Sequence, residues 1–171
     1  MCEQPRSCPT ESPRQAALAG PQLRRDAGFE PSPTKLAVWT YVSEDAGEAA
    51  EVAQKYMSQY SDSALRHYEL LGDHLKNIKG YEAYAAQSEA LRQDSSVFTD
   101  QFSQAHPWGT PEQAIEKTKA LAHAFGTDEM MFVFRYGDMP MELAEKSMRL
   151  FAEKVLPALK EIKTKPISAA G

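Results

Sequence analysis

Short segments that are apolar on both sides constrain the fold of this chain most. Residues 35–42 and 130–135 are apolar almost throughout, without polar alternation, and a weaker apolar run spans residues 102–108. Strands of this kind need burial on both faces, as in a parallel sheet that is covered by helices. A helix-like segment follows each run, so the sequence predicts an α/β fold of parallel strand-to-helix units. Three such strands are too few to close into a barrel by themselves.

Length and composition set the general class of protein. The chain has 171 residues, with 42% hydrophobic and 25% charged residues, which is typical of one soluble globular domain. The net charge of −5 argues against a nucleic-acid partner, and no basic stripe or long apolar run suggests a membrane. The first residues lack the apolar core of a signal peptide. We therefore expect a cytoplasmic protein.

Both ends of the chain are expected to lie outside the folded domain. Residues 1–13 contain Cys2 and Cys8 among prolines, with too few apolar residues to fold alone, and are expected to be a disordered leader. The cysteine spacing matches neither a zinc site nor a dithiol motif, which favours two incidental reduced thiols. Residues 166–171 are expected to be a frayed tail, so the predicted domain spans residues 14–165.

Capping signals mark where two helices begin. Asp45 is suited to cap a helix, with Glu48 in the position that completes a capping box. Thr110 is followed by Pro111, which is favoured at the first helical position, and by Gln113, which can return to the cap. The sequence therefore predicts helices that begin near residues 46 and 111.

The order of these elements predicts how they pack. We expect the two strong strands to be parallel in one sheet, with the helices near 46–60 and 111–125 on one of its faces. Residues 61–101 form a helix-compatible insertion that is longer than an ordinary barrel connection. Two roles suit this insertion, a lid over a substrate or a simple cover for exposed surface. Pro157 lies within the last helical pattern and should kink that helix.

Four stretches of the sequence are distinctive in their order and spacing: AVWTYVSED (37–45), HLKNIKGYE (74–82), WGTPEQ (108–113) and FRYGDMP (134–140). Together they resemble the C-terminal part of the bacterial luciferase-like flavin-dependent monooxygenases. The resemblance covers residues 22–162 and extends onto residues 147–153 after the last stretch.

This resemblance implies about the last three strand-helix units of a (β/α)₈ barrel, which needs about 250 residues when complete. It implies an oxidoreductase that inserts oxygen into a small organic substrate with reduced flavin mononucleotide, or with a deazaflavin in some branches. Most flavin contacts in that family come from earlier strands, so we expect this chain alone not to bind the flavin tightly. The alternatives are a truncated, non-catalytic fragment and a partner-dependent subunit, which self-association or a complementing barrel half would complete.

In a (β/α)₈ barrel, functional groups gather at the C-terminal ends of the strands. The sequence identifies neither a catalytic residue nor a metal site. The alternative to ligand binding for Arg135 is an ion pair with Asp138. The alternative for the aromatic residues is a place in the ordinary hydrophobic core. The candidates for cofactor-binding or substrate-pocket residues are Tyr41, His106, Trp108, Arg135 and Tyr136.

A group of methionines lies in and after the last strand. Its members are most simply explained as adaptable core filling, because the thioether side chain fits irregular gaps. They are Met130, Met131, Met139 and Met141.

Overall fold

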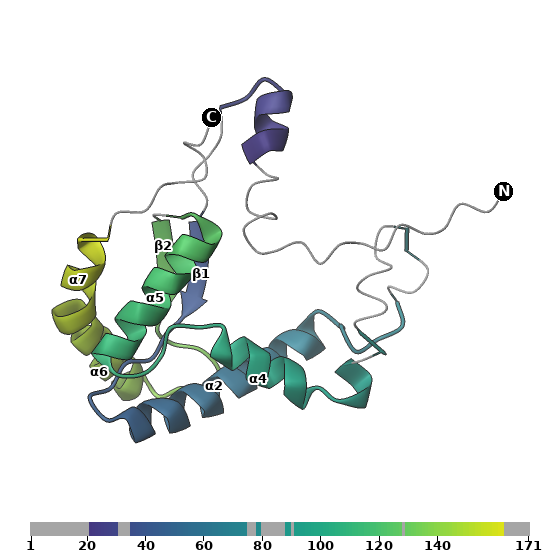
Figure 1. Ribbon diagram of the computed structural model, residues 1–171. Coiled ribbons are helices and arrows are strands. Elements are labelled where there is room, and N and C mark those ends of the chain that lie inside the picture. Colours follow the sequence, from purple (N-terminus) through teal and green to yellow (C-terminus); the bar gives the residue numbers. More distant parts are fainter. Residues whose placement is uncertain are drawn as a thin grey trace.

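The computed structural model describes residues 21–30, 35–74, 78–79, 88–89, 91–127 and 129–162. At its centre, strand β1 (Lys35–Trp39) lies parallel to strand β2 (Glu129–Val133) in a two-stranded sheet (Figure 1). The predicted parallel pairing of the two strong strands is thus confirmed. The leader expected at 1–13 and the tail expected at 166–171 lie outside the described residues.

The predicted strand at residues 102–108 is wrong. Helix α4 (Ser96–Gln104) occupies the first part of this segment, and the only strand-like pairing there is one parallel bridge between Val42 and Gly109. The apolar spacing is helical, because Phe98 and Phe102 lie one turn apart with ring centroids 6.4 Å apart. The described part of the chain is therefore mixed α/β, rich in helix, with two parallel strands rather than three barrel units.

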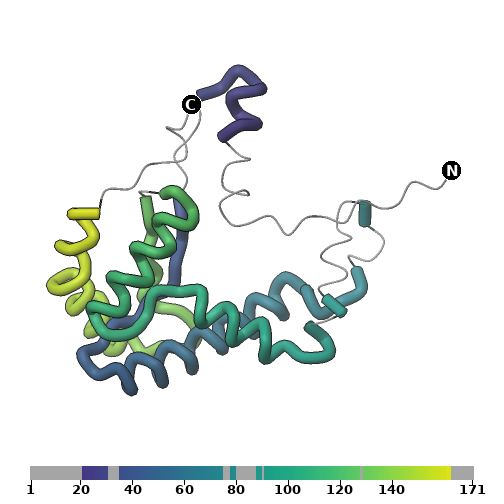
Figure 2. The backbone as a smooth tube through the Cα atoms, viewed as in Figure 1, coloured from purple at the N-terminus to yellow at the C-terminus, as the bar shows by residue number. Residues whose placement is uncertain are grey.

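The helix after β1 is longer than predicted. Helix α2 (Ala46–His67) packs beside α4, and the pair runs away from the sheet (Figure 2). The Asp45 side chain caps α2 by accepting a 2.8 Å hydrogen bond from the Glu48 N–H. The Glu48 carboxylate makes other contacts instead of completing the box. The two ends of the region expected as an insertion thus belong to the last turns of α2 and to the start of α4.

Helix α5 (Pro111–Phe125) begins and ends as predicted. Thr110 accepts from the Gln113 N–H while the Gln113 side chain accepts from the Thr110 N–H at 2.9 Å, which completes a capping box. Gly126 ends the helix in the left-handed conformation with φ 57°. Helix α5 therefore returns the chain from the α2–α4 pair to the start of β2.

The expected kink at Pro157 takes the form of a wide helical turn. Helix α6 (Met141–Leu150) continues into the π-helical segment η1 (Phe151–Val155) and then into α7 (Leu156–Lys160). The Leu156 N–H donates to the Phe151 carbonyl, which is one residue further back than in an α-helix. Proline cannot donate a backbone hydrogen bond, so the regular α-helical ladder is interrupted here.

Two apolar clusters lie on opposite sides of the sheet, because Tyr41 and Val42 are adjacent in extended backbone and point in opposite directions. We call the cluster around Tyr41 the strand-end cluster and the cluster around Val42 the helix-covered cluster. The strand-end cluster has as its buried members Tyr41, Ala49, Ala53, Tyr56, Met57, Tyr136, Met139 and Ala144. The helix-covered cluster has Val42, Ala114, Phe151 and Val155.

The prediction that both helices cover one face is therefore wrong. Helix α5 packs with η1 against Val42, Phe132 and Phe134, whereas α2 packs against Tyr41 on the other side. Helix α2 begins a few residues after β1 and lies across the strand end, where Ala49 and Ala53 allow close approach to the Tyr41 ring. One face of the sheet is therefore covered by α5 and η1. The other face is covered by α2 and α4 only where the strands end.

The methionines differ in burial. Met139 is fully buried in the strand-end cluster, as core filling predicts. Met131 on β2 and Met141 on α6 are 62% and 56% exposed, so the core interpretation is wrong for them.

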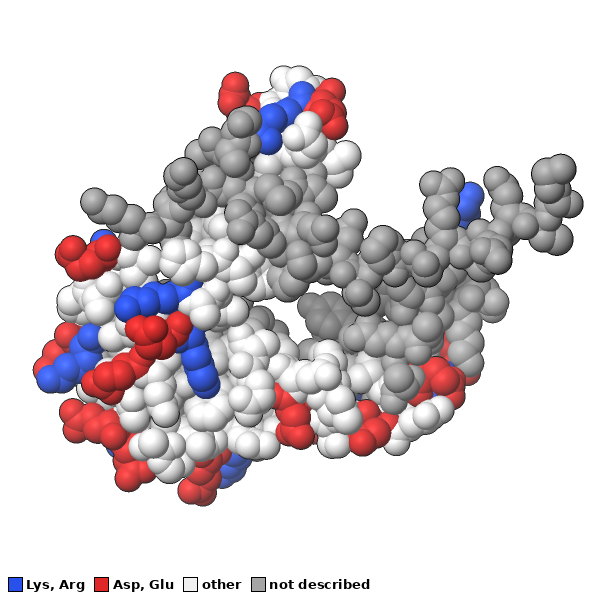
Figure 3. Space-filling view, viewed as in Figure 1, with Lys and Arg blue, Asp and Glu red and all other residues white. Residues whose placement is uncertain are grey.

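The surface carries mixed charge. Lys and Arg side chains lie beside Asp and Glu over the part of the molecule that holds α5, α6 and α7 (Figure 3). The Arg149–Glu145 pair at 2.7 Å and the Lys119–Glu116 pair at 2.8 Å are examples. Among the described helices, none is both long enough and apolar enough to cross a membrane.

Candidate functional site

An aromatic group built around Trp39 lies at the C-terminal end of β1. The Trp39 ring centroid is 4.8 Å from that of Tyr60, 5.4 Å from that of Phe102 and 5.0 Å from that of His106. These rings come from β1, α2, α4 and the turn after α4. Tilted and edge-on contacts at these distances stabilise aromatic pairs. Two helices and a turn thus place an aromatic wall where the strands end.

His106 is part of this wall, and its polar atoms form no hydrogen bonds. Its ring is 4.5 Å from that of Phe102, and both imidazole nitrogens are buried with no hydrogen-bond partner. Burial lowers the pKa of His106 to about 4. The imidazole is therefore neutral near pH 7 and offers one donor and one acceptor.

Two further polar groups are buried without a partner. Tyr136 is 4% exposed and its hydroxyl forms no hydrogen bond, as is also true of the Ser103 hydroxyl. Burial raises the pKa of Tyr136 above its ordinary value, so the phenol stays protonated. A buried polar group without a partner costs about 1–3 kcal/mol. Groups left in this state near a strand end are candidates for contact with a ligand.

Tyr41 differs from Tyr136 because its hydroxyl is engaged. It donates to the Glu48 carboxylate over 3.2 Å, and burial, with the nearby charge of Glu48, raises the pKa of Tyr41 to about 12. Tyr41 is fully buried in the strand-end cluster. Its phenol therefore anchors β1 to α2.

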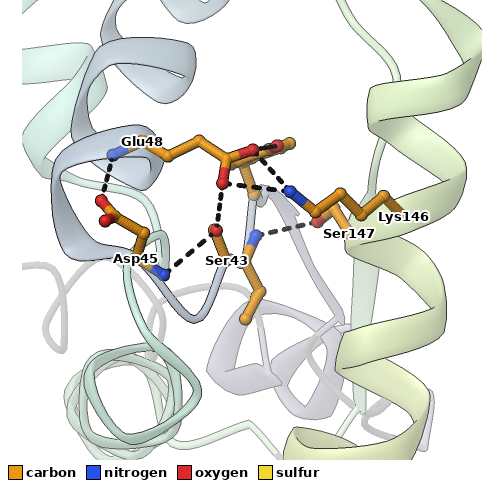
Figure 4. A network of polar contacts seen from close by, with 7 residues as sticks. Ser43, Asp45, Glu48, Lys146 and Ser147 are labelled. Carbon is orange, nitrogen blue, oxygen red and sulfur yellow. Dashed lines mark hydrogen bonds and ion pairs between the residues drawn. The ribbon is translucent and has the colours of Figure 1, made fainter.

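A polar network joins the end of β1 to α2 and α6 (Figure 4). The Glu48 carboxylate accepts from the Ser43 hydroxyl at 2.7 Å and from Lys146 Nζ at 2.8 and 3.0 Å. These hydrogen bonds lower the pKa of the Glu48 carboxyl, and the bond from Lys146 contributes most. Ser147 accepts from the Val42 N–H at 2.8 Å. The network fixes three elements around the strand end.

Trp108 uses its polar atom within the protein. Its Nε1–H donates to the Ser103 carbonyl at 2.8 Å. Lys117 Nζ lies 3.7 Å from the Trp108 ring centroid and donates to the Trp108 carbonyl at 3.0 Å. Burial lowers the pKa of Lys117. Trp108 thus holds the turn between α4 and α5, which carries His106.

Arg135 lies apart from the aromatic wall. It is exposed, and its Nε–H donates to the Met139 carbonyl at 3.2 Å. The described structure shows no ion pair between Arg135 and Asp138, whose N–H instead donates to Gln59 Oε1 at 3.1 Å. Gly137 between them has φ 58°, which glycine adopts readily. The guanidinium therefore remains available to a ligand or to solvent.

The structure brings four of the five predicted site residues together. Tyr41 and Tyr136 belong to the strand-end cluster, Trp108 packs against it, and His106 contacts its partly buried member Trp39. Their functional roles stay predictions. Sequence reasoning did not assign Phe102, Glu48 or Lys146 to the site. Glu48 and Lys146 are 98 positions apart, so no local signal predicts their contact.

The N-termini of the long helices near the strand ends do not suit the phosphate of a flavin nucleotide. A phosphate needs free N–H donors at a helix N-terminus, or basic residues. Each long helix near the strand ends instead carries an acid in its first turn, namely Glu48 in α2, Glu112 in α5 and Glu142 in α6. Nor does any group of three or more His, Cys, Asp or Glu side chains among the described residues suit a metal ion.

Comparison with solved structures shows a similarity to the crystal structure of monooxygenase RslO1 from Streptomyces bottropensis. The identity is 25% and the TM-score 0.50, over 87% of this chain and 40% of that chain. This chain thus spans less than half the length of that protein. No protein-family model matches the sequence, and no curated protein matches it. The chain shares the fold of part of a monooxygenase.

Proposed function

We propose that this chain forms the organic-substrate side of a monooxygenase-type site of the luciferase-like, flavin-dependent class. The observation that carries the proposal is the pair of unpartnered polar groups, His106 and Tyr136, buried beside aromatic rings at the strand ends. The similarity to part of a monooxygenase supports the reaction type.

The chemistry of the wall suits an apolar substrate with one or two polar atoms. Aromatic rings exclude water and provide flat contact area, while a few polar groups fix the orientation of the ligand. The neutral His106 imidazole can donate to a carbonyl or accept from a hydroxyl, and the protonated Tyr136 phenol can donate. A substrate that satisfies these groups would also remove their cost in the free protein.

The cofactor is proposed on the family resemblance alone. Reduced flavin mononucleotide, or a deazaflavin, would supply the oxygen chemistry when bound, while this chain orients the substrate. Because acidic first turns surround the strand ends, the helix N-termini there would not bind the phosphate of that cofactor.

A non-catalytic or partner-dependent chain is the second candidate. The acidic first turns of the helices and the two-stranded sheet of the described residues favour it. In this alternative the aromatic wall is a packed core, and its unpartnered polar groups bind no substrate.

A chimera tests these alternatives. This chain would replace the region of monooxygenase RslO1 that it matches, and oxygen uptake would be measured with reduced flavin mononucleotide and a panel of phenols and aromatic ketones. In the chimera, we expect His106→Phe and Tyr136→Phe each to lower kcat/KM about tenfold, the effect of about 1.4 kcal/mol, without lowering Tm.

Met141→Lys on the exposed face of α6 is the matched control and should leave kcat/KM unchanged. Arg135→Ala tests the remaining candidate, and we expect it to reduce turnover more than stability. If the His106 and Tyr136 variants fold and turn over like the parent chimera, the wall is only a core and the second candidate stands.

A further inference from the structure

An apolar groove lies on the helix-covered side of the sheet, between α5 and α7 (Figure 1). It is lined by Met130 and Phe132 of β2, by Ala122 of α5, and by Leu156 and Leu159 of α7. Its volume is about 290 Å³, close to the lower end of the range of about 300–1,000 Å³ that small-molecule sites occupy. The size of the groove therefore suits a small organic ligand.

The groove is separate from the proposed substrate site. Thr127 and Met130 place it at the start of β2, whereas Tyr136 follows the end of that strand. The two sites also lie on opposite faces of the sheet, because Phe132 and Leu159 pack against the helix-covered cluster. A ligand in the groove would therefore bind whether or not the proposed function is correct.

The wide turn of η1 lies at one end of the groove. The N–H of Leu156 donates to the Phe151 carbonyl at the end of this turn, and the Leu156 side chain lines the groove. Turns of the π-helical kind are rare and occur frequently at functional sites. Leu156 is 37% exposed, so apolar surface at the groove is open to solvent. An apolar ligand would be stabilised by covering it.

The polar groups that line the groove favour a negatively charged ligand. The hydroxyls of Thr118 and Thr127 donate to backbone carbonyls at 2.7 and 2.9 Å, so their protons are used within the protein. Lys160 also lines the groove, and it forms no ion pair or hydrogen bond with a described residue. None of the described residues that line the groove is acidic. The groove thus joins an apolar lining to a cation without a counter-charge.

We infer that this groove binds a small arylalkyl carboxylate, with the carboxylate at Lys160 and the aromatic ring beside Met130 and Phe132. Aromatic rings pack favourably on one another, and a thioether sulfur makes favourable contacts with a ring edge. The carboxylate supplies the acceptor that the Lys160 ammonium group lacks. A lysine near a helix C-terminus is favoured by the helix dipole in any protein, so the inference rests on the lysine together with the apolar lining.

Other ligands fit the groove less well. Inorganic phosphate would pair with Lys160 but leave the apolar lining uncovered, and an uncharged hydrocarbon would leave Lys160 unpaired. Binding to an anionic membrane surface needs a cluster of cations. On the elements beside the groove, Lys119 and Lys154 each already contact a carboxylate, at 2.8 and 3.5 Å. The inferred ligand is therefore a free organic acid.

The test uses the full chain, with phenylbutyrate as the probe and phenylbutanol as its uncharged analogue. Titration calorimetry measures the affinity, and changes in the NMR shifts of backbone amides locate the ligand. We expect saturable binding of the acid, with the largest shift changes at Phe132 and Leu159. Lys160→Gln should weaken binding of the acid about three- to fivefold, the effect of an exposed ion pair, and leave binding of the alcohol unchanged.

Lys154→Gln on η1 is the matched control, because Lys154 does not line the groove, and it should bind both probes like the unaltered chain. Ala122→Leu places a larger side chain in the groove and should weaken binding of both probes about tenfold or more. The Tm of each variant shows whether it folds. If Ala122→Leu does not fold, the two lysine variants and the shift changes still decide the result.

Three results would overturn the inference. They are the absence of saturable binding, equal affinity of Lys160→Gln and Lys154→Gln for the acid, and shift changes that centre on His106 and Tyr136. The last result would place the acid at the proposed substrate site. Vesicles of phosphatidylglycerol provide a further arm of the experiment. Binding of the chain to these vesicles through Lys160 would show a membrane surface as the ligand and would also overturn the inference.

Discussion

The helix-covered cluster and the strand-end cluster differ in what they bury. Every member of the first is apolar, from Val42 and Phe151 to the partly buried Phe132 that packs on them. The second includes Tyr136, with an unpartnered hydroxyl, and contacts His106, with two unpartnered nitrogens. Buried polar groups without partners lower stability, so they are retained where function requires them. The first cluster therefore serves the stability of the fold, and the proposed function assigns contact with a ligand to the polar groups at the second.

The largest effect is expected from truncation in the helix-covered cluster. Phe151 is 5% exposed and contacts the rings of Phe132 and Phe134 at 4.7 and 5.2 Å. Phe151→Ala should lower the free energy of unfolding by about 3–4 kcal/mol, the usual loss for a buried phenylalanine. Phe102→Ala, on the only partly buried aromatic wall, should cost about half of that. Urea unfolding of both variants measures the difference, and equal losses would contradict the distinction between the clusters.

A backbone substitution tests how tightly the turn after β2 is held against α2. A Cβ at Gly137 would lie 2.9 Å from the Tyr56 carbonyl oxygen, and φ there is 58°. We expect Gly137→Ala to cost about 2–3 kcal/mol from the close contact and the strained backbone together. Gly28→Ala is the control, because φ is 79° there but a Cβ meets nothing within 4 Å. It should cost about 1 kcal/mol, and an equal cost at both positions would show that α2 can move away.

The pH dependence of stability reports on His106. Its pKa is about 4 in the folded protein and about 6.5 in the unfolded chain, so between these values the unfolded state binds more protons. The free energy of unfolding therefore falls as the pH is lowered from about 6.5 toward 4, and His106 has no such effect above that range.

His106→Phe should remove this contribution, which at pH 5 is about 1–2 kcal/mol for a partly buried ring. Urea unfolding of variant and parent at pH 7 and pH 5 measures this contribution. The carboxylates titrate in both proteins, so their effect cancels in the comparison. If variant and parent lose the same free energy of unfolding between pH 7 and pH 5, the His106 ring is solvated.

The smallest effect is expected in the polar network. The Glu48–Lys146 pair is partly exposed, with 31% and 56% of the side-chain areas accessible, so solvent weakens it. Glu48→Gln removes the charge and keeps one of the two oxygens that accept from Tyr41 and Ser43, and it should cost about 0.5–1 kcal/mol. The cost should shrink in 1 M salt, because screening acts on the charge pair. A salt-independent loss would show that the hydrogen bonds, rather than the ion pair, matter.

Local sequence signals predicted the elements that depend on neighbouring residues. The Thr110 cap, the end of that helix near residue 125 and the parallel pairing of two apolar strands followed from pattern and spacing. The segment 102–108 was predicted wrongly because short apolar runs do not distinguish a strand from a helix. The place of α2 was missed because spacing alone does not show on which face of the sheet a helix packs, and here that depends on the fit of Ala49 and Ala53 against Tyr41.

The site was likewise predicted only in part, because local sequence patterns do not show how side chains pack. His106 and Tyr136 follow from the rule that functional groups lie near strand ends, but their lack of partners is a property of packing. One signal was available in the sequence. Ser147 lies in the apolar stripe of the last helix, where a hydroxyl needs a partner, and the structure shows the Val42 N–H bonded to it.

The most direct test of the account is the titration of the His106 imidazole. The chain has four histidines, and the His106 signal is the one absent from the NMR spectrum of His106→Phe. The account predicts a midpoint near pH 4, from a neutral ring buried without a partner. A midpoint near the ordinary value of 6.5 would show that the ring is open to water. His106 would then not be one of the buried, unpartnered groups on which the proposed substrate site depends.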